Sequence, residues 1–175
     1  MRTKTTATSG CAVLALLIAL AQPAAAQTRL AVDGSAGWVG FPDDGHLVSE
    51  TLAGVAARYY VGARFAVGPE LVFIQGDGHS HLVLTGNLSF DLRRSGSGHT
   101  ARTTPFVVVG GGLYQTREQF LSGGPYTSRE GAFTAGGGVR VPVGQRGTVG
   151  VEARMGWEAH LRLNAVFGWQ FGGAP

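Results

Sequence analysis

The last quarter of the chain alternates between apolar and polar residues with a period of two. On one parity, residues 148–171 carry almost only apolar side chains, and on the other they carry mainly charged, polar and glycine residues. The apolar set is Val149, Val151, Ala153, Met155, Trp157, Leu161, Leu163, Ala165, Phe167, Trp169 and Phe171. Because successive side chains of a β-strand point to opposite faces, this pattern predicts two strands, 148–157 and 161–171, each with one apolar face.

Similar alternation recurs along the chain, in segments separated by turn-forming residues. Eight strands are predicted, at 29–41, 49–61, 65–75, 81–93, 103–116, 131–143, 148–157 and 161–171. The run 106–109 (Phe-Val-Val-Val) is apolar on both faces, so the orientation of its strand stays open. Regularly spaced strands in an even number are typical of an up-and-down barrel. We therefore predict an all-β fold, an eight-stranded antiparallel β-barrel.

Residues 1–26 have the features of an export signal. Arg2 and Lys4 give a positively charged start, residues 11–21 are an apolar stretch, and Ala26 ends a run of small residues that signal peptidase accepts. We predict cleavage after Ala26 and a single mature domain, 27–175. Cleavage lowers the Lys+Arg count from 14 to 12 against 11 Asp+Glu, and no basic cluster for nucleic-acid binding is present.

Aromatic residues distinguish a soluble barrel with an apolar interior from a membrane barrel with an apolar exterior. On the apolar parity they fall near the two ends of the strands, like the interfacial aromatic girdles of membrane barrels. One predicted girdle, at the exterior end, holds Trp38 and Trp157, and the periplasmic girdle holds Tyr59, Phe65, Phe90, Trp169 and Phe171. We therefore expect the apolar face to contact lipid. A soluble periplasmic, lipocalin-like barrel is the less favoured alternative.

Charged residues gather on the opposite parity. An arginine on the lipid face would cost roughly 2–4 kcal/mol at the bilayer midplane, so these residues are predicted to face the lumen. The lumen of an eight-stranded barrel is only wide enough for side chains to fill, and an unpaired buried charge is strongly destabilising. We predict a closed lumen filled by a network of Asp33, Glu70, Arg140, Glu152, Arg154 and Arg162, with Glu70, Arg140, Glu152 and Arg154 near its middle.

Two glycine triplets, 110–112 and 136–138, lie on neighbouring predicted strands. A hairpin centred on Gly124 would place Gly110 opposite Gly138 and Gly112 opposite Gly136, which predicts a glycine strip in the wall. Glycine in barrel strands mostly permits curvature or the close approach of a ring, and docking of lipid or a partner is the alternative. Neither triplet lies at a strand-to-helix turn, which argues against a phosphate-binding loop.

Histidine, serine and acidic residues near the predicted exterior rim suggest two chemistries. His79 and His81 are two residues apart and share a face, as metal ligands would, but the spacing fixes no third ligand. We therefore expect no metal and no cofactor. A lipid A-modifying hydrolase would need Ser80, His81 and Glu130 to converge, and we expect no enzyme. The segment 117–130 offers a third possibility, adhesion to a host surface through an exterior loop.

Three segments share the features of one known family. They are 104–114 (TPFVVVGGGLY), 136–143 (GGGVRVPV) and 166–171 (VFGWQF). They resemble the small outer-membrane β-barrel family that includes the membrane domain of outer membrane protein A, and the similarity covers essentially 27–171. The resemblance implies an integral protein of a Gram-negative-type outer membrane, with a structural or surface-interaction role. It also implies contact with outer-membrane lipid and lipopolysaccharide, and insertion by the barrel-assembly machinery through the C-terminal strand, which ends at Phe171.

Overall fold

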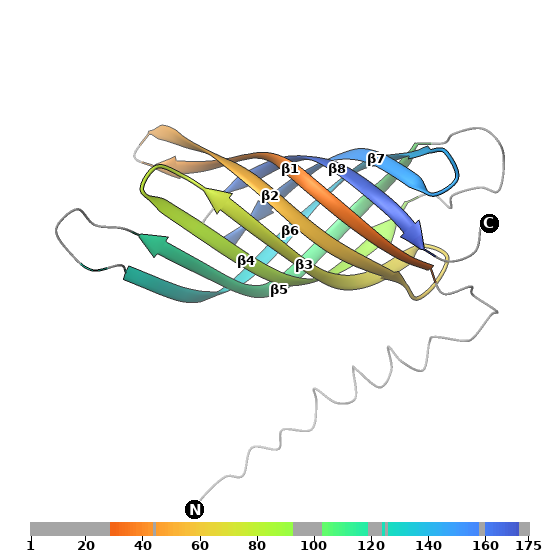
Figure 1. The fold of residues 1–175 in the computed structure, drawn as a ribbon, viewed down its shortest axis with the longest axis horizontal. Coiled ribbons are helices and arrows are strands. Elements are labelled where there is room, and N and C mark those ends of the chain that lie inside the picture. The colour runs from red at the N-terminus through yellow and green to blue at the C-terminus, as the bar shows by residue number, and fades with distance from the viewer. Residues whose placement is uncertain are drawn as a thin grey trace, which may run out of the picture.

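The computed structural model describes residues 29–43, 45–92, 103–118, 124, 126–157 and 160–171, which form one closed β-barrel (Figure 1). Each strand is antiparallel to the next, and the last pairs with the first. The strands are β1 (Arg29–Asp43), β2 (His46–Tyr60), β3 (Phe65–Gln75), β4 (His79–Asp91), β5 (Thr104–Glu118), β6 (Tyr126–Val143), β7 (Gly147–Gly156) and β8 (Leu161–Phe171). The predicted eight-stranded antiparallel barrel is confirmed. The predicted signal segment, 1–26, lies outside the described residues.

The two ends of the barrel carry different chain segments. β1 begins and β8 ends at one end, where Leu30 pairs with Phe171, and we call this end the terminal rim (Figure 1). The turns at 61–64 and 144–146 also lie there, because each antiparallel strand returns the chain to the rim it left. We call the opposite end the distal rim. No helix within the described ranges is long and apolar enough to cross a membrane.

Several strands extend further at the distal rim than the alternation predicted. β2 begins at His46 instead of residue 49, β4 at His79 instead of 81, and β6 at Tyr126 instead of 131. Gly45 and Gly78, with φ of 85° and 78°, occupy the left-handed region and let the chain reverse within very few residues. The tight turns leave more residues to the strands. These added residues are largely polar, so hydrophobic alternation did not reveal them.

The outer wall of the barrel is apolar. Every strand exposes large apolar side chains on this wall, up to 66% exposure at Met155. Trp157 lies at the distal rim, and Trp38 lies on the same face, half-buried because its ring covers Gly40. The aromatic residues near the terminal rim are Tyr59, Phe65, Phe90, Trp169 and Phe171. The aromatic residues thus stand at the two ends of an apolar band.

β5, whose orientation the sequence left open, has its two faces clearly separated in the barrel. Phe106 and Val108 are each 3% exposed and point inward, whereas Val107 and Val109 are exposed on the outer wall. The ring of Phe106 lies under the guanidinium of Arg140, 3.5 Å from the ring centroid to Cζ. Both faces of this segment are apolar because the inner one packs against the lumen side chains and the outer one belongs to the apolar wall.

β5 and β6 pair in a register different from the predicted one. The observed pairs are Gly110–Thr134, Gly112–Ala132, Val108–Gly136 and Phe106–Gly138. The hairpin is centred two residues before Gly124, so the facing glycine strip does not form. Because the offset is even, each residue keeps its predicted face. The glycines instead fit where neighbouring strands approach closely, since a Cβ at Gly112 would overlap the carbonyl oxygen of Leu84, and one at Gly138 would meet the Phe106 ring.

Candidate functional site

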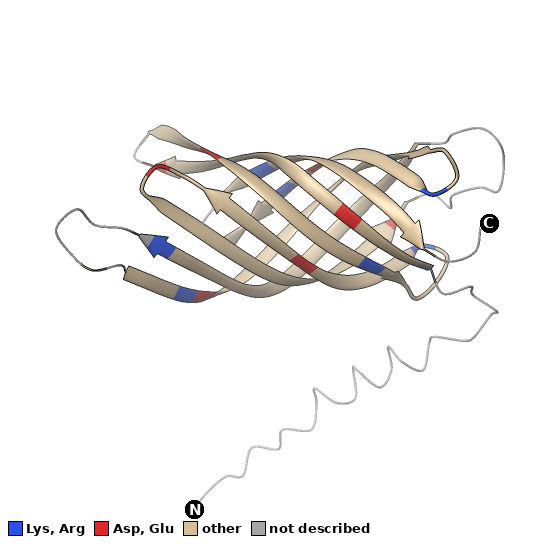
Figure 2. Cartoon of the chain, viewed as in Figure 1, with Lys and Arg blue, Asp and Glu red and all other residues tan. Residues whose placement is uncertain are grey.

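The lumen holds the buried charges of the described residues. Figure 2 shows acidic and basic positions at intervals along a mostly uncharged wall. Nine charged side chains are no more than 8% exposed: Asp33, Glu50, Arg58, Glu70, Asp91, Arg140, Glu152, Arg154 and Arg162. The inner face is therefore charged and the outer face apolar, the reverse of a soluble barrel. These charges fall into groups at successive levels of the lumen.

The middle cluster consists of Glu70, Glu152, Arg154 and Arg162. Arg154 donates from Nη1 to Glu70 at 2.8 Å and from Nε to Glu152 at 2.6 Å. Arg162, which is 1% exposed, lies 3.5 Å from the other oxygen of Glu70. The carboxylates also accept hydrogen bonds from Thr85, Asn87 and Asn164. Two carboxylates and two guanidinium groups give a cluster with no formal net charge, which is what permits these charges to be buried together.

The terminal cluster consists of Asp33, Arg58, Asp91 and Arg140, nearer the terminal rim. Arg58 donates to both carboxylate oxygens of Asp33, with Nη2 at 2.7 Å from Oδ1. Arg140 Nη1 lies 3.2 Å from Asp91 Oδ1. The prediction that Arg140 lies near the middle of the network is wrong. It lies three residues before the terminal end of β6, and its partner, Asp91, ends β4 at the same rim.

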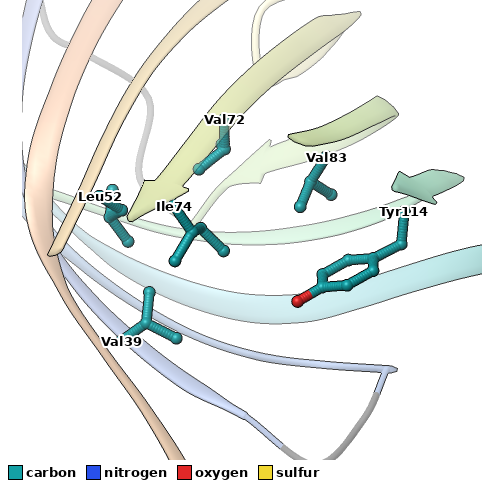
Figure 3. Close-up of a cluster of buried hydrophobic side chains, with 6 residues drawn as sticks. All are labelled: Val39, Leu52, Val72, Ile74, Val83 and Tyr114. Atoms are coloured by element: carbon teal, nitrogen blue, oxygen red, sulfur yellow. The ribbon is translucent and has the colours of Figure 1, made fainter. Parts of the chain in front are cut away.

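The distal collar, an apolar cluster, lies between the middle cluster and the distal rim. Its inward-pointing members are Val39, Leu52, Val72, Ile74, Val83 and Tyr114 (Figure 3). Along β3 the inward residues run from Glu70 through Val72 to Ile74, so the collar directly follows the charged level. Sequence reasoning missed it because these residues share the parity of the charged side chains. The signal was present in β3, where residues 71–74 are apolar on both faces.

Side chains leave little empty space between the two charged clusters. A cavity of about 30 Å³ remains there, which is room for one or two water molecules. Its lining includes Asp33, Arg58, Glu70, Arg140, Glu152 and Arg154. The described part of the lumen is therefore packed at the level of the charged clusters.

The distal mouth carries a further polar group. Glu50 of β2 contacts Nε2 of His79, and its second oxygen lies 3.8 Å from Nε2 of His81. Sequence spacing paired the two histidines with each other, but only the closed barrel brings Glu50 to them, because β3 lies between β2 and β4.

A third histidine, His160, packs beside this group. Its ring centroid lies 5.3 Å from that of Phe41, and its Nδ1 donates to the Trp157 carbonyl at 2.7 Å. Burial lowers the pKa of His160; the hydrogen bond to Trp157 raises it, and the charge of Arg162 lowers it further. His160 therefore favours its neutral form.

The residues of a hydrolase do not converge. Ser80 and His81 are consecutive in β4, so their side chains point to opposite faces of the wall, with His81 buried in the lumen. Glu130 is exposed and accepts a hydrogen bond from Ser128, which belongs to its own strand. The serine, histidine and acid weighed for lipid A hydrolysis thus form no triad.

Solved structures of similar architecture include bacterial surface proteins. Neisserial surface protein A matches with a TM-score of 0.69 at 10% identity, over 81% of this chain and 97% of that one. The N-terminal β-barrel domain of Pseudomonas aeruginosa OprF matches with 0.61 at 12% identity, over 83% and 100%. This chain has the fold of the small outer-membrane β-barrels.

A third similar structure is Ail, the attachment invasion locus protein of Yersinia pestis, in complex with the heparin analogue sucrose octasulfate. It matches with a TM-score of 0.59 at 8% identity, over 83% of this chain and 99% of that one. No family model matches this sequence, and no curated protein matches it in sequence. At these identities the likeness concerns the fold.

Proposed function

We propose that the mature chain is an integral outer-membrane barrel with a closed lumen and a structural or surface-interaction role. The observation that carries the proposal is the distribution of side chains between the two faces of one wall. The outer face exposes a continuous band of large apolar side chains, whereas the charged side chains of the membrane-level strands are buried in the lumen. An apolar surface on this scale is stable only where lipid or another apolar phase covers it.

The closed lumen is supported by two different obstructions in series. The middle cluster fills the bore with paired charges, and the distal collar follows it with aliphatic side chains. A hydrophobic constriction excludes water and ions even where a narrow gap remains. We expect no steady single-channel conductance of porin size in planar bilayers, and such a conductance would overturn the closed lumen.

One pair of variants tests membrane insertion directly. Val151 lies halfway along β7 and is 60% exposed, and Leu47 lies beside the distal turn and is 56% exposed. In a membrane, Val151→Arg should lower the free energy of unfolding by roughly 2–4 kcal/mol, whereas Leu47→Arg should cost no more than about 1 kcal/mol near the interface. A soluble barrel would tolerate both changes equally.

The measurement is unfolding in urea of protein refolded into lipid vesicles, read by gel mobility before and after boiling. A folded small barrel migrates differently from the boiled chain, so the shifted band reports the folded fraction. Cell fractionation completes the test. Recovery of the wild-type chain in the periplasmic fraction without detergent, together with no mobility shift, would overturn the membrane assignment.

The proposed partners follow from the location. Outer-membrane lipid and lipopolysaccharide would cover the apolar band, and the barrel-assembly machinery would bind the C-terminal strand through Phe171, which is exposed at the terminal rim. Export would depend on residues 1–26. The amino terminus of the protein purified from membranes should then be Gln27, and Phe171→Gln should reduce the assembled amount in cells.

A surface-interaction role would involve the distal rim. Arg117, Tyr126 and Arg129 are exposed there, beside residues 119–123, which lie outside the described ranges. The structurally similar Ail was solved with a bound sulfated sugar, which suggests a class of ligand to test first. Replacing residues 117–130 by a short turn should abolish binding to heparin-coated surfaces without changing the gel mobility shift. If binding to heparin-coated surfaces does not change, the surface-interaction role is contradicted and the structural role alone remains.

A further inference from the structure

Glu50, His79 and His81 direct their side chains to one point inside the distal mouth. Their candidate ligand atoms all lie within 4.8 Å of one another. His79 and His81 face the lumen together because they are two residues apart on β4. Gly76 makes room for the third residue, since a Cβ there would meet both the Glu50 carboxylate and His79 Nε2. The glycine therefore lets the turn after β3 pass close to both side chains.

Both imidazole rings are held with Nε2 facing Glu50. His79 Nδ1 donates to the Asp77 carbonyl at 3.0 Å, and His81 Nδ1 lies 3.0 Å from the Thr116 hydroxyl oxygen. Metal-binding histidines almost always use their second nitrogen in this way, because the outer hydrogen bond fixes the tautomer and the ring orientation. These contacts hold both rings with Nε2 toward Glu50, as the rings of metal-binding histidines are held.

The charge balance at Glu50 differs from that of the other lumen carboxylates. The Glu50 side chain is 1% exposed, and the ion pairs of the described residues join it only to the two histidines. Glu70 and Glu152 both meet Arg154 instead. A buried carboxylate needs a compensating cation, and Glu50 Oε2 also has no hydrogen-bond partner. A bound divalent cation would satisfy both requirements.

We propose that Glu50, His79 and His81 bind one divalent transition-metal ion of the zinc class at the distal mouth. Two imidazole nitrogens and one carboxylate match the ligand preferences of Zn²⁺, whereas Ca²⁺ and Mg²⁺ prefer oxygen ligands alone. Tetrahedral Zn²⁺ places ligand atoms about 3.3 Å apart. His81 Nε2 lies 3.8 Å from Glu50 Oε2, and the candidate ligand atoms of the three residues lie within 4.8 Å of one another, so the side chains would move closer together to bind one ion.

The fourth coordination position would be open. His79 is the most exposed of the three ligands, at 28%, so the opening faces solvent at the mouth and would take water or a small anionic ligand. The distal collar lies directly below and separates the site from the middle cluster. The site would thus be a surface-accessible metal centre in a closed barrel. Its three ligands are positioned by the barrel fold, so the proposal does not require a particular role in the membrane.

The test is calorimetric titration of ZnCl₂ into refolded, tag-free protein, with Co²⁺ absorption as the second readout. We expect saturable binding of one ion. His79→Ala, His81→Ala and Glu50→Gln should each weaken it by more than about 100-fold, beyond the 10–100-fold effect of losing an outer-shell partner. His46→Ala is the matched control, because His46 is exposed at the same rim. It should bind like the wild type.

Folding is checked separately by the gel mobility shift, and His79→Gln is a second variant that removes the imidazole with less loss of volume. Zn²⁺ should also raise the urea midpoint of the wild type but not that of either His79 variant, because binding to the folded state alone stabilises it. Absence of saturable Zn²⁺ binding to folded wild type would overturn the proposal. Equal weakening by His46→Ala would do the same.

Discussion

Two adjacent levels of one lumen are filled by opposite kinds of side chain. The middle cluster buries Glu70, Glu152, Arg154 and Arg162, and the distal collar buries aliphatic side chains and one tyrosine. The bore of a narrow barrel must be filled whatever the chemistry of its side chains, because an empty lumen forfeits their packing. The difference shows that parity decides which residues face inward, but not whether the interior is held by charge pairing or by apolar packing.

Substitutions in the middle cluster and in the distal collar should destabilise the barrel for different reasons. In the charged level, stability depends on partners, so removing one charge leaves its partner buried without a compensating charge. In the collar it depends on volume, so removing methyl groups leaves a cavity whatever the neighbours are. The following variants test that contrast, measured as free energies of unfolding in urea for protein refolded into lipid vesicles.

Arg154→Met should lower the free energy of unfolding more than any other variant in this series. It leaves Glu152 without its guanidinium partner and Glu70 with only the longer contact to Arg162, so we expect a loss of about 3–5 kcal/mol. Arg64→Met, at an exposed turn, is the control and should change stability by less than about 0.5 kcal/mol. Adding Glu152→Gln to Arg154→Met should recover part of the loss. No recovery would contradict a partner-dependent cluster.

Ile74→Ala in the distal collar should lower the free energy of unfolding by about 2–5 kcal/mol, on average slightly less than Arg154→Met does. Ile74 is fully buried and packs within the apolar cluster, so truncation opens a cavity. Ile74→Val removes one methylene group and should cost about 0.5–1.5 kcal/mol. The ratio of the two losses should follow the removed volume. Equal losses would mean that the collar is not closely packed.

Gly112 lies at the boundary of the two levels, and we expect a loss of roughly 1–3 kcal/mol for Gly112→Ala through overpacking. The added Cβ would overlap the Leu84 carbonyl oxygen and approach Thr85. Gly111→Ala is the matched control, because within 4 Å its Cβ would meet only the Ala132 carbonyl oxygen, at 3.8 Å. It should be neutral or slightly stabilising. If both variants behave alike, the close approach of β4 and β5 is not what selects glycine.

The smallest expected effect concerns pH at the distal mouth. The folded state lowers the pKa of His160, so on acidification the unfolded chain binds a proton at a pH where the folded chain does not. Stability from this residue is therefore complete above the ordinary histidine pKa and falls as the pH drops below it. His160→Asn keeps a hydrogen-bond donor for the Trp157 carbonyl. It should reduce the slope of the free energy of unfolding against pH by at most about 1.4 kcal/mol per pH unit. An unchanged slope between pH 7 and 5 would contradict this role.

Sequence reasoning placed single residues on faces better than it placed them opposite each other. Glu152, Arg154 and Arg162 lie in the lumen as the parity of β7 and β8 predicted. The predicted pairing of the two glycine triplets was wrong, because the register of β5 and β6 depends on the length of their connection and not on any periodicity. The orientation of 106–109 was undetermined, because valine suits an apolar wall and an apolar lumen equally well.

The candidate metal site shows the same limit. The sequence brings His79 and His81 to one face, but Glu50 is separated from them by β3, and no spacing rule joins residues across an intervening strand. Arg140 is a second case, because its partner, Asp91, became evident only when the strand ends were aligned at the terminal rim.

The strands, their number and the two unlike faces of the wall follow from the amino-acid sequence alone, because alternation is a local property of an extended backbone. Which inward residues meet depends on how the strands pair and close into a barrel. Registers and closure between strands set the distal collar, the separation of the two charged clusters and the approach of Glu50 to His79 and His81. These contacts join residues far apart in the chain, and their geometry depends on the stagger of a closed barrel, which no local pattern records.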